Sequence, residues 1–264
     1  MAVQPRLAAT VMVLRNDSVG QGIEVFMVRR VVQSEFMPDV YVFPGGSASA
    51  DDVQAEQTEG ICVPVTSSAA DPEGRTRLGS GVRAAAIREL FEEANVLLAY
   101  HNGAMLAVSA PMVARFAHYR ELFNTRKGSL IEMARNEQLV LATDRLAYCA
   151  HWITPEIMPK RYDTHFFLAV APAEQEAMYD HLETSDGIWI QPASALQRYE
   201  AGKFPIAFPT FHQLRDLAQF QSVEQALQAA ETRYVPTHRP LVSRKDGSIY
   251  VSLPEEPERL WKAQ

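Results

Sequence analysis

The sequence predicts an α/β fold, and three observations support this prediction. Short apolar runs rich in β-branched and aromatic residues, which are typical of buried strands, recur along the chain. A strongly amphipathic helical pattern over 81–95 lies between two of these runs, and a second helical region follows at 111–144. Strands and helices that alternate in this way are typical of a sheet covered by helices. The predicted strands are 8–14, 23–28, 40–43, 147–153, 165–170 and 188–190.

The composition excludes several classes of protein. Of the 264 residues, 47% are hydrophobic and the formal net charge is −7, so there is no basic excess that would favour nucleic acid as a partner. No apolar run approaches the roughly 20 residues of a membrane span, and we find no secretion signal. The two cysteines, Cys62 and Cys149, suit a reducing compartment, and the seven histidines show no metal-ligand spacing. We therefore expect a cytoplasmic protein.

The first two predicted strands, 8–14 and 23–28, are followed by the pair Arg29-Arg30. From the residues alone, these arginines are interpreted as a solvated strand end. The strand at 40–43 ends in Pro44-Gly45-Gly46, a turn in which the backbone can come close to a ligand.

The segment 47–80 is dense in Ala, Ser, Gly, Asp and Pro. A structureless loop of this length is unusual in a compact domain and tends to be functional or disordered. Only 61–65 within it looks able to pack. We expect Ser80 to cap the helix that runs from about 81 to 95.

The region after this helix predicts a turn at 101–103 between two short apolar pieces, followed by a helical pair. The pair covers roughly 111–144, with 129–136 and 139–141 together forming its second helix. It is interpreted either as a structural cover or as a lid over the substrate. A partly helical segment at 173–183 follows the strand at 165–170.

The last third of the chain predicts further helices and a hairpin. A short helix begins at Pro192, in the position that proline prefers. Thr210 is expected to cap a helix to about 217, and another helix covers 223–233. The runs 241–242 and 248–252 predict a hairpin around Asp246-Gly247.

The helix at 81–95 carries the most informative pattern. At about 100° per residue, Arg88, Glu89, Glu92 and Glu93 lie in one arc, opposite the apolar arc that packs on the core. Carboxylates three and four residues apart repel each other. A divalent cation such as Mg²⁺ would turn this repulsion into a binding site. The alternative interpretation is a solvated acidic face.

The sequence Tyr-Val-Phe-Pro-Gly-Gly at 41–46 and the sequence Arg-Glu-Leu-Phe-Glu-Glu-Ala-Asn-Val at 88–96 together resemble the signature of the Nudix hydrolases. Gly46 matches the leading glycine, and Asp52 stands where the first acidic residue is expected. The chain departs from the compact signature in a long insertion before Arg88. It also has Asn95 in place of glycine, which is a mild change because Asn is the next-best residue for a left-handed helix end.

The resemblance implies a Nudix fold, a mixed β-sheet sandwiched between helices, with a helical insertion and a C-terminal helical and hairpin extension. We expect one domain over 1–264, with insertions at about 47–80 and 111–144 and an extension at about 205–264. The resemblance also implies Mg²⁺ or Mn²⁺ as cofactor. The implied metal ligands are Glu89, Glu92, Glu93 and Gly46.

The resemblance implies roles for further residues. Glu183, or Glu89 itself, would take the proton from the attacking water, with Asp186 and then Glu174 or Glu176 as the next candidates for this acid. Arg88 would orient the carboxylates. It implies that Arg29 or Arg30 holds a substrate phosphate, since a guanidinium offers forked donors to phosphate oxygens. Lys160 and Arg161, just before the strand at 165–170, are interpreted either as solubilising charge or as a contact of Lys160 or Arg161 with the diphosphate.

The order of the motifs along the chain is similar to that of the peroxisomal-type coenzyme A diphosphatase branch of the family. That branch implies cleavage of coenzyme A or acyl-coenzyme A to 3′,5′-ADP and a phosphopantetheine. Other diphosphate substrates remain open, namely ADP-ribose, NADH and dinucleoside polyphosphates, as does a non-catalytic nucleotide-binding module. The expected partner is a small nucleoside diphosphate derivative, without nucleic acid or membrane. A homodimer is possible by analogy with other Nudix enzymes.

Overall fold

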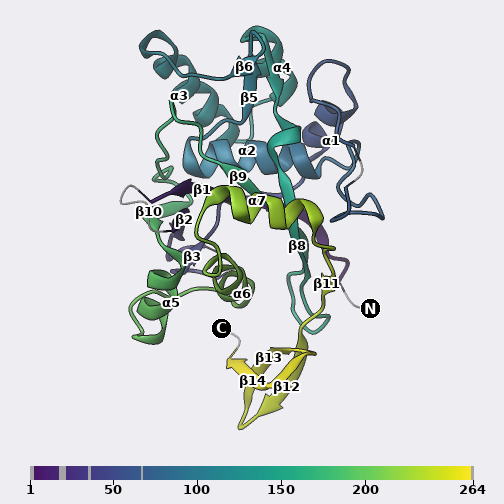
Figure 1. Ribbon diagram of the computed structural model, residues 1–264, viewed down its shortest axis with the longest axis vertical. Coiled ribbons are helices and arrows are strands. Elements are labelled where there is room, and N and C mark those ends of the chain that lie inside the picture. Colours follow the sequence, from purple (N-terminus) through teal and green to yellow (C-terminus); the bar gives the residue numbers. More distant parts are fainter. Residues whose placement is uncertain (1–2, 18–21, 35–36, 67, 263–264) are drawn as a thin grey trace.

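The predicted α/β fold is confirmed by the computed structural model, which describes residues 3–17, 22–34, 37–66 and 68–262 (Figure 1). Its main sheet is built from eight strands: β1 (Arg6–Asn16), β2 (Ile23–Arg30), β3 (Tyr41–Val42), β4 (Gly45–Ser47), β8 (Ala147–Ile153), β9 (Tyr162–Val170), β10 (Thr184–Ile190) and β11 (Thr237–His238). The order is β10-β2-β1-β9-β8-β11, with β3 beside β2 and β4 beside β1. The sheet is mixed, because β1 pairs with β9 and β8 with β11 in parallel while the other pairs are antiparallel.

Helices cover both faces of this sheet. They are α1 (Ala50–Gln57), α2 (Val82–Ala94), α3 (Ala110–Asn124), α4 (Leu130–Asn136), α5 (Pro192–Glu200), α6 (Phe208–Leu217) and α7 (Val223–Thr232). Successive side chains of β1 point to opposite faces, so Val11 and Val13 pack in the core under α2 while Met12 and Leu14 pack in the core under α7. Figure 1 shows α2 and α7 on opposite sides of β1 and β9.

The start of α2 differs from the prediction. The N-cap is Gly81, with φ of 83°, and not Ser80. The carboxylate of Glu56 accepts hydrogen bonds from the backbone N–H groups of Gly81 (2.7 Å), Arg83 (2.8 Å) and Ala84 (3.0 Å). A carboxylate on α1 therefore accepts hydrogen bonds from the free amides at the N-terminus of α2, and its negative charge interacts favourably with the positive end of the helix dipole. A neutral serine hydroxyl would stabilise this helix end less.

The segment 47–80, residue 67 apart, is more ordered than its composition predicts. It contains α1, which begins with a capping box in which Ser49 and Asp52 satisfy each other's backbone amides. Ile61 and Cys62 are buried, and the backbone N–H of Val63 donates to Leu141. This small-residue segment therefore packs against residues 139–141 and against α2 instead of lying free.

Three further predictions were wrong. Residues Leu139–Leu141 form strand β7, which pairs with β5 (Ala99–His101), instead of continuing α4. Residues 173–183 contain turns and no helix. Helix α6 begins after Ala207, so Thr210 lies inside it and is buried. In the first two cases a short local pattern was overridden by contacts with distant segments. Helix α6 instead begins at a local signal, a proline in its first turn.

The predicted turn at 101–103 and the predicted C-terminal hairpin are confirmed, whereas Gly45 and Gly46 of the turn predicted at 44–46 lie in strand β4. Strand β5 forms a hairpin with β6 (Ala104–Met105), and Asn95 ends α2 with φ of 59°. Strands β12 (Leu241–Lys245) and β13 (Ser248–Leu253) form a hairpin whose Asp246 and Gly247 both have positive φ. A third strand, β14 (Glu256–Lys262), adds to β13 and was not predicted. Within the described ranges, no helix is long and apolar enough to span a membrane.

Candidate functional site

The acidic face of α2 lies against strand β4 at one wall of a large cavity. Glu89, Glu92 and Glu93 all line this cavity, and each is largely withdrawn from solvent, with 13% of the side-chain surface exposed for Glu89 and Glu92 and 4% of the residue exposed for Glu93. A solvated acidic face is therefore excluded. Three carboxylates held together with little water need a compensating positive charge.

Arg88 supplies part of this charge and holds the carboxylates in place. Its Nε and Nη2 donate to the two oxygens of Asp52, both at 2.9 Å, in a bidentate pair. Its Nη1 donates to Glu89 at 2.9 Å and to Glu92 at 2.8 Å. Its donors therefore hold the carboxylates of Asp52, Glu89 and Glu92 in fixed positions.

Strand β4 approaches α2 closely, and its glycines make this possible. The backbone N–H of Gly45 donates to Glu93 Oε2 at 2.9 Å. A methyl group on Gly46 would lie 2.5 Å from Cδ of Glu89 and 2.7 Å from its Oε2. A side chain at position 46 would therefore displace the Glu89 carboxylate, so Gly46 allows the strand to lie this close to α2.

The electrostatics of the acidic site favour a bound cation. Burial, opposed by Arg88 and reinforced by Glu92, raises the pKa of Glu89 to about 7. Burial and the neighbouring Glu89 charge raise the pKa of Glu93 well above its ordinary value. A cluster of carboxylate and backbone oxygens with an excess of negative charge is the donor set that Mg²⁺ and Mn²⁺ prefer, so the residues present fit such an ion.

A fourth carboxylate comes from the other end of the chain. Glu183 lies just before β10 and lines the same cavity. Burial is the largest cause of the raised pKa of Glu92 and of Glu93, and the negative charge of Glu183 is a smaller cause that acts in the same direction. Its backbone N–H donates to the Asp180 carboxylate at 3.1 Å, which holds the loop before β10.

The other acidic candidates lie elsewhere. Asp186 accepts a 2.5 Å hydrogen bond from the Tyr41 hydroxyl, and Asp186, Glu174 and Glu176 are not among the residues that line the cavity. Of the four acids that the sequence offered for this role, the fold therefore brings Glu183 to the acidic site.

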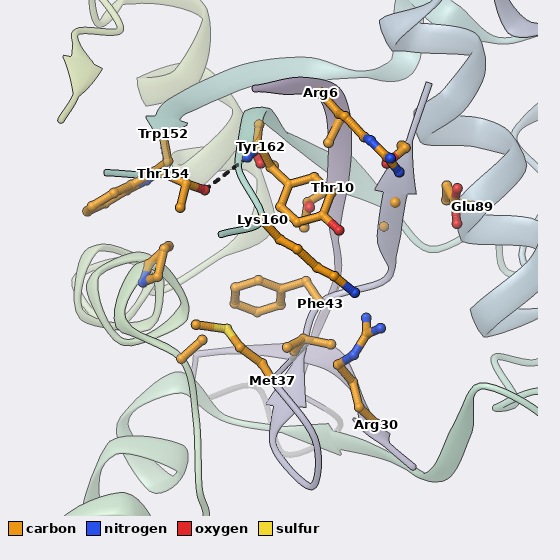
Figure 2. A pocket seen from close by; sticks show the side chains of 18 of the residues that line it. Arg6, Thr10, Arg30, Met37, Phe43, Glu89, Trp152, Thr154, Lys160 and Tyr162 are labelled. Carbon is orange, nitrogen blue, oxygen red and sulfur yellow. Dashed lines mark hydrogen bonds between the residues drawn. The ribbon is translucent and has the colours of Figure 1, made fainter. Parts of the chain in front are cut away.

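The cavity has a volume of about 1230 Å³ and extends well beyond the acidic site. Figure 2 shows Glu89 on one side of it and Trp152 on the opposite side, with Arg30 and Lys160 between them. Phe208 packs edge-on against Trp152, and further apolar side chains line the cavity, namely Phe43, Met37, Phe166 and Ile206. The cavity thus combines an acidic end, a cationic middle and an apolar end.

The predicted substrate-binding residues are separated by the fold. Arg30 lines the cavity and donates to Ser34 Oγ at 2.9 and 3.0 Å, whereas Arg29 is not a lining residue and pairs with Asp39 at 2.9 Å. Arg161 lines the cavity but is 8% exposed, and its guanidinium donates to the backbone carbonyls of Thr154 and Val3.

Lys160, the alternative to Arg161, extends into the cavity, as does Arg6 on β1 (Figure 2). The sequence did not predict Arg6 as a cavity residue, because a single arginine at the start of an apolar strand gives no indication of a binding site. Glu56 was likewise not predicted, because its role at the start of α2 depends on a contact 25 residues along the chain.

Comparison with known proteins places this geometry in a family. A sequence model of the NUDT19 Nudix domain matches residues 78–217. The acyl-coenzyme A diphosphatase NUDT19 of Xenopus laevis is 24% identical over 89% of this chain and 72% of its own length, and that of Gallus gallus is 25% identical over 89% and 74%. The crystal structure of a NUDIX hydrolase from Alicyclobacillus acidocaldarius is 25% identical, with a TM-score of 0.71, and covers 86% of this chain and 96% of that one.

The family model covers more than half of the chain, and the chain therefore belongs to the NUDT19 Nudix domain family. It is a Nudix pyrophosphohydrolase, of the branch that includes coenzyme A diphosphatases. The resemblance stated from the motifs is thus confirmed, and the alternative of a non-catalytic module is set aside. Nudix hydrolases generally use divalent cations, which agrees with the chemistry of the acidic site.

Proposed function

We propose that this enzyme hydrolyses the diphosphate bond of coenzyme A or acyl-coenzyme A, releasing 3′,5′-ADP and a phosphopantetheine or its acyl ester. The observation that carries the proposal is the cavity in which four carboxylates at one end face an apolar wall across a cationic middle. Such a cavity suits a long substrate with phosphates at one side and a neutral arm at the other. The proposal also draws on relatives named as acyl-coenzyme A diphosphatases.

The proposed division of labour follows the chemistry of each region. The carboxylates of Glu89, Glu92 and Glu93, with the Gly46 carbonyl, would hold Mg²⁺ or Mn²⁺. When bound, such an ion neutralises the diphosphate and lowers the pKa of a coordinated water. Arg88 keeps the carboxylates oriented through its pairs with Asp52, Glu89 and Glu92.

Proton transfer in this proposal falls to Glu183. It lies outside the network of Arg88, on the loop before β10, and faces the same cavity. A carboxylate that is not engaged by the arginine is free to accept the proton of the attacking water. Glu89 is the alternative base, and it is the more constrained of the two because it accepts a hydrogen bond from Arg88.

The substrate phosphates are assigned to the cationic middle of the cavity. Arg30 and Lys160 extend toward the space between the acidic site and the apolar wall (Figure 2). The pantetheine arm would lie against Phe43 and the residues near Trp152. Arg29 is dropped from this assignment, because it pairs with Asp39 away from the cavity.

The test is hydrolysis of a panel of diphosphates with Mg²⁺ and with Mn²⁺. The panel contains coenzyme A, acetyl-coenzyme A, ADP-ribose, NADH and a diadenosine polyphosphate, and products are separated by chromatography. We expect 3′,5′-ADP from the coenzyme A compounds at the highest kcat/KM. A preference for ADP-ribose or NADH would refute the substrate assignment while leaving the diphosphate chemistry in place.

A pair of variants tests the acidic site itself. Glu93→Gln is expected to lower metal-dependent turnover by about 100-fold or more, since it removes one of the carboxylates that would hold the metal ion. Glu121→Gln, on the exposed face of α3 with 74% of its side chain accessible, is the matched control and should leave turnover unchanged. Full activity in a folded Glu93→Gln variant would refute the site.

A further inference from the structure

A cluster of two histidines and an aspartate lies outside the cavity, on the opposite face of the main sheet. His151 is on β8, while Asp163 and His165 are two residues apart on β9. Trp152 and Phe166, the next residues along the two strands, line the cavity, whereas none of the three cluster residues does. Because side chains alternate along a strand, the cluster faces the core under α2.

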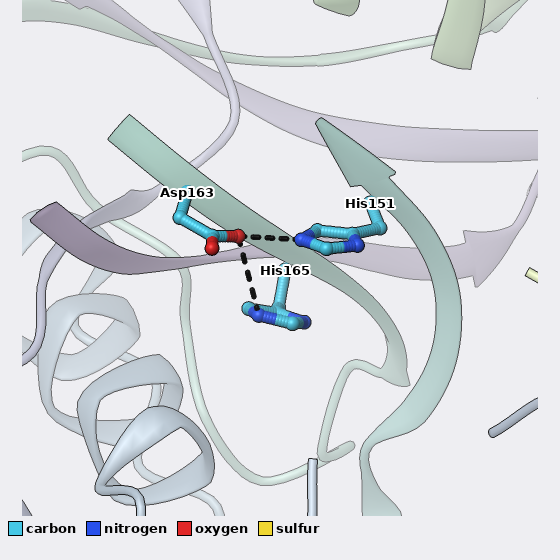
Figure 3. A group of neighbouring side chains, drawn as sticks. All are labelled: His151, Asp163 and His165. Carbon is cyan, nitrogen blue, oxygen red and sulfur yellow. Dashed lines mark hydrogen bonds and ion pairs between the residues drawn. The ribbon is translucent and has the colours of Figure 1, made fainter. Parts of the chain in front are cut away.

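Strand pairing brings the three side chains together. His151 and His165 are direct partners in the antiparallel register of β8 and β9, and their rings stack with centroids 4.3 Å apart. Asp163 Oδ1 lies 2.5 Å from His151 Nε2 and 3.6 Å from His165 Nε2 (Figure 3). One ligand atom from each residue falls within 4.8 Å of the other two.

The outer nitrogens of both imidazoles are held by hydroxyl groups. His151 Nδ1 lies 2.9 Å from Thr237 Oγ1, and His165 Nδ1 lies 3.1 Å from the Tyr148 hydroxyl. A histidine that binds a metal through one nitrogen usually engages its other nitrogen in this way, which fixes the ring orientation. Both Nε2 atoms are thereby turned toward the same carboxylate oxygen.

We propose that His151, Asp163 and His165 form a second cation site, separate from the acidic site, that binds one Zn²⁺ or a similar transition-metal ion. Two imidazole nitrogens and one carboxylate oxygen are the ligands of a three-residue zinc site, with water in the fourth position. The acidic site on α2 offers oxygen donors alone, which suit Mg²⁺ or Mn²⁺. The two sites therefore differ in the class of ion that they select.

Binding requires a local movement, in which one of the two stacked imidazole rings turns so that both Nε2 lone pairs can point at one ion. Ligand atoms around a tetrahedral zinc are about 3.3 Å apart, given metal–ligand distances of roughly 2.0–2.1 Å. The separation between Asp163 and His165 already has this size, while that between Asp163 and His151 must widen by under about 1 Å. Asp163 can make this adjustment because 31% of its side chain is exposed, and the same exposure gives the ion a path from solvent.

The bound ion would join β8 to β9. Through Thr237 it would also fix β11, the strand that leads to the C-terminal strands β12–β14. We therefore assign a structural role to this site, in which Zn²⁺ raises the thermal stability of the protein without taking part in hydrolysis.

The test is calorimetric titration of Zn²⁺ into the full-length protein in excess Mg²⁺, with Tm measured in parallel. We expect one Zn²⁺ per chain and a rise in Tm, both retained in Glu93→Gln. In Asp163→Asn and in His165→Gln the affinity should fall by more than about 100-fold and the rise in Tm should disappear. His118→Gln, with 65% of that side chain exposed on α3, is the matched control and should behave as the wild type.

Two results would overturn the proposal. One is the absence of stoichiometric Zn²⁺ binding by the wild-type protein. The three side chains would then only link β8 to β9 by hydrogen bonds. The other is Zn²⁺ binding that survives in Asp163→Asn but is lost in Glu93→Gln, which would place the ion at the acidic site. Asp163→Asn alone decides the question if the buried His165→Gln fails to fold, because Asp163 is partly exposed.

Discussion

Substitution of Arg88 by glutamine removes the one guanidinium shared by Asp52, Glu89 and Glu92. The Arg88 side chain is 12% exposed and that of Asp52 is fully buried. The carboxylates would therefore lose their cationic partner in a site with little solvent exposure. Removing one member of a buried ion pair costs about 3–5 kcal/mol, most of it from the uncompensated charge. We expect Arg88→Gln to lower the free energy of unfolding by this amount when metal is removed with EDTA.

The assay is urea denaturation followed by circular dichroism, with EDTA and with saturating Mg²⁺. Because a cation bound by the same carboxylates replaces part of the lost positive charge, the destabilisation should be smaller with Mg²⁺. Arg115→Gln is the matched control: that arginine makes a bidentate pair with Glu137, but 53% of its side chain is exposed, so its loss should change stability little. If the two variants lose similar stability in EDTA, the reasoning is wrong.

Three further predictions concern neighbouring features. Gly46→Ala should lower turnover by about 100-fold with an unchanged circular dichroism spectrum, because the added methyl group displaces the Glu89 carboxylate. Wild-type activity in this variant would contradict the close approach of Gly46 to Glu89. Since the pKa of Glu89 is raised to about 7 in the folded state against 4.5 ordinarily, its ionisation opposes folding. In EDTA, the stability of the wild type relative to Glu89→Gln should therefore fall by about 3 kcal/mol as the pH rises from 4.5 to above 7, and a flat difference in urea titrations would refute this. Asn95→Ala should cost about 1 kcal/mol, because alanine is strained at φ of 59°, whereas Asn95→Gly should be nearly neutral in the same titration.

Features set by short-range geometry were predicted correctly from the sequence. The helical period alone puts Glu89, Glu92 and Glu93 on one face of α2, and a left-handed helix end favours Asn or Gly at position 95. The hairpin between β12 and β13 follows in the same way from Asp246-Gly247, since both residues tolerate positive φ. These patterns are complete within a few residues, so distant segments do not alter them.

Features that depend on distant contacts were not predictable. The local pattern of residues 139–141 predicts a helix, but these residues form a strand because they pair with β5. The local pattern also predicts Ser80 as the helix cap, but the Glu56 carboxylate on α1 binds the amides at the helix start instead. The choice of Glu183 among four acids depends on where the loop before β10 is placed relative to α2. The sequence limited these possibilities, and the tertiary structure selected among them.

The histidine cluster illustrates the same division. His151 and His165 are 14 residues apart, with none of the short spacings of a helical or loop metal site, so the sequence reasoning found no metal-ligand pattern among the histidines. The antiparallel register of β8 and β9 makes them direct neighbours and adds Asp163 on the same face. The sequence by itself determined the chemistry of the acidic helix and the family to which it belongs. Only the tertiary structure decided which distant side chains share a site, because strand register and helix packing are properties of the whole chain.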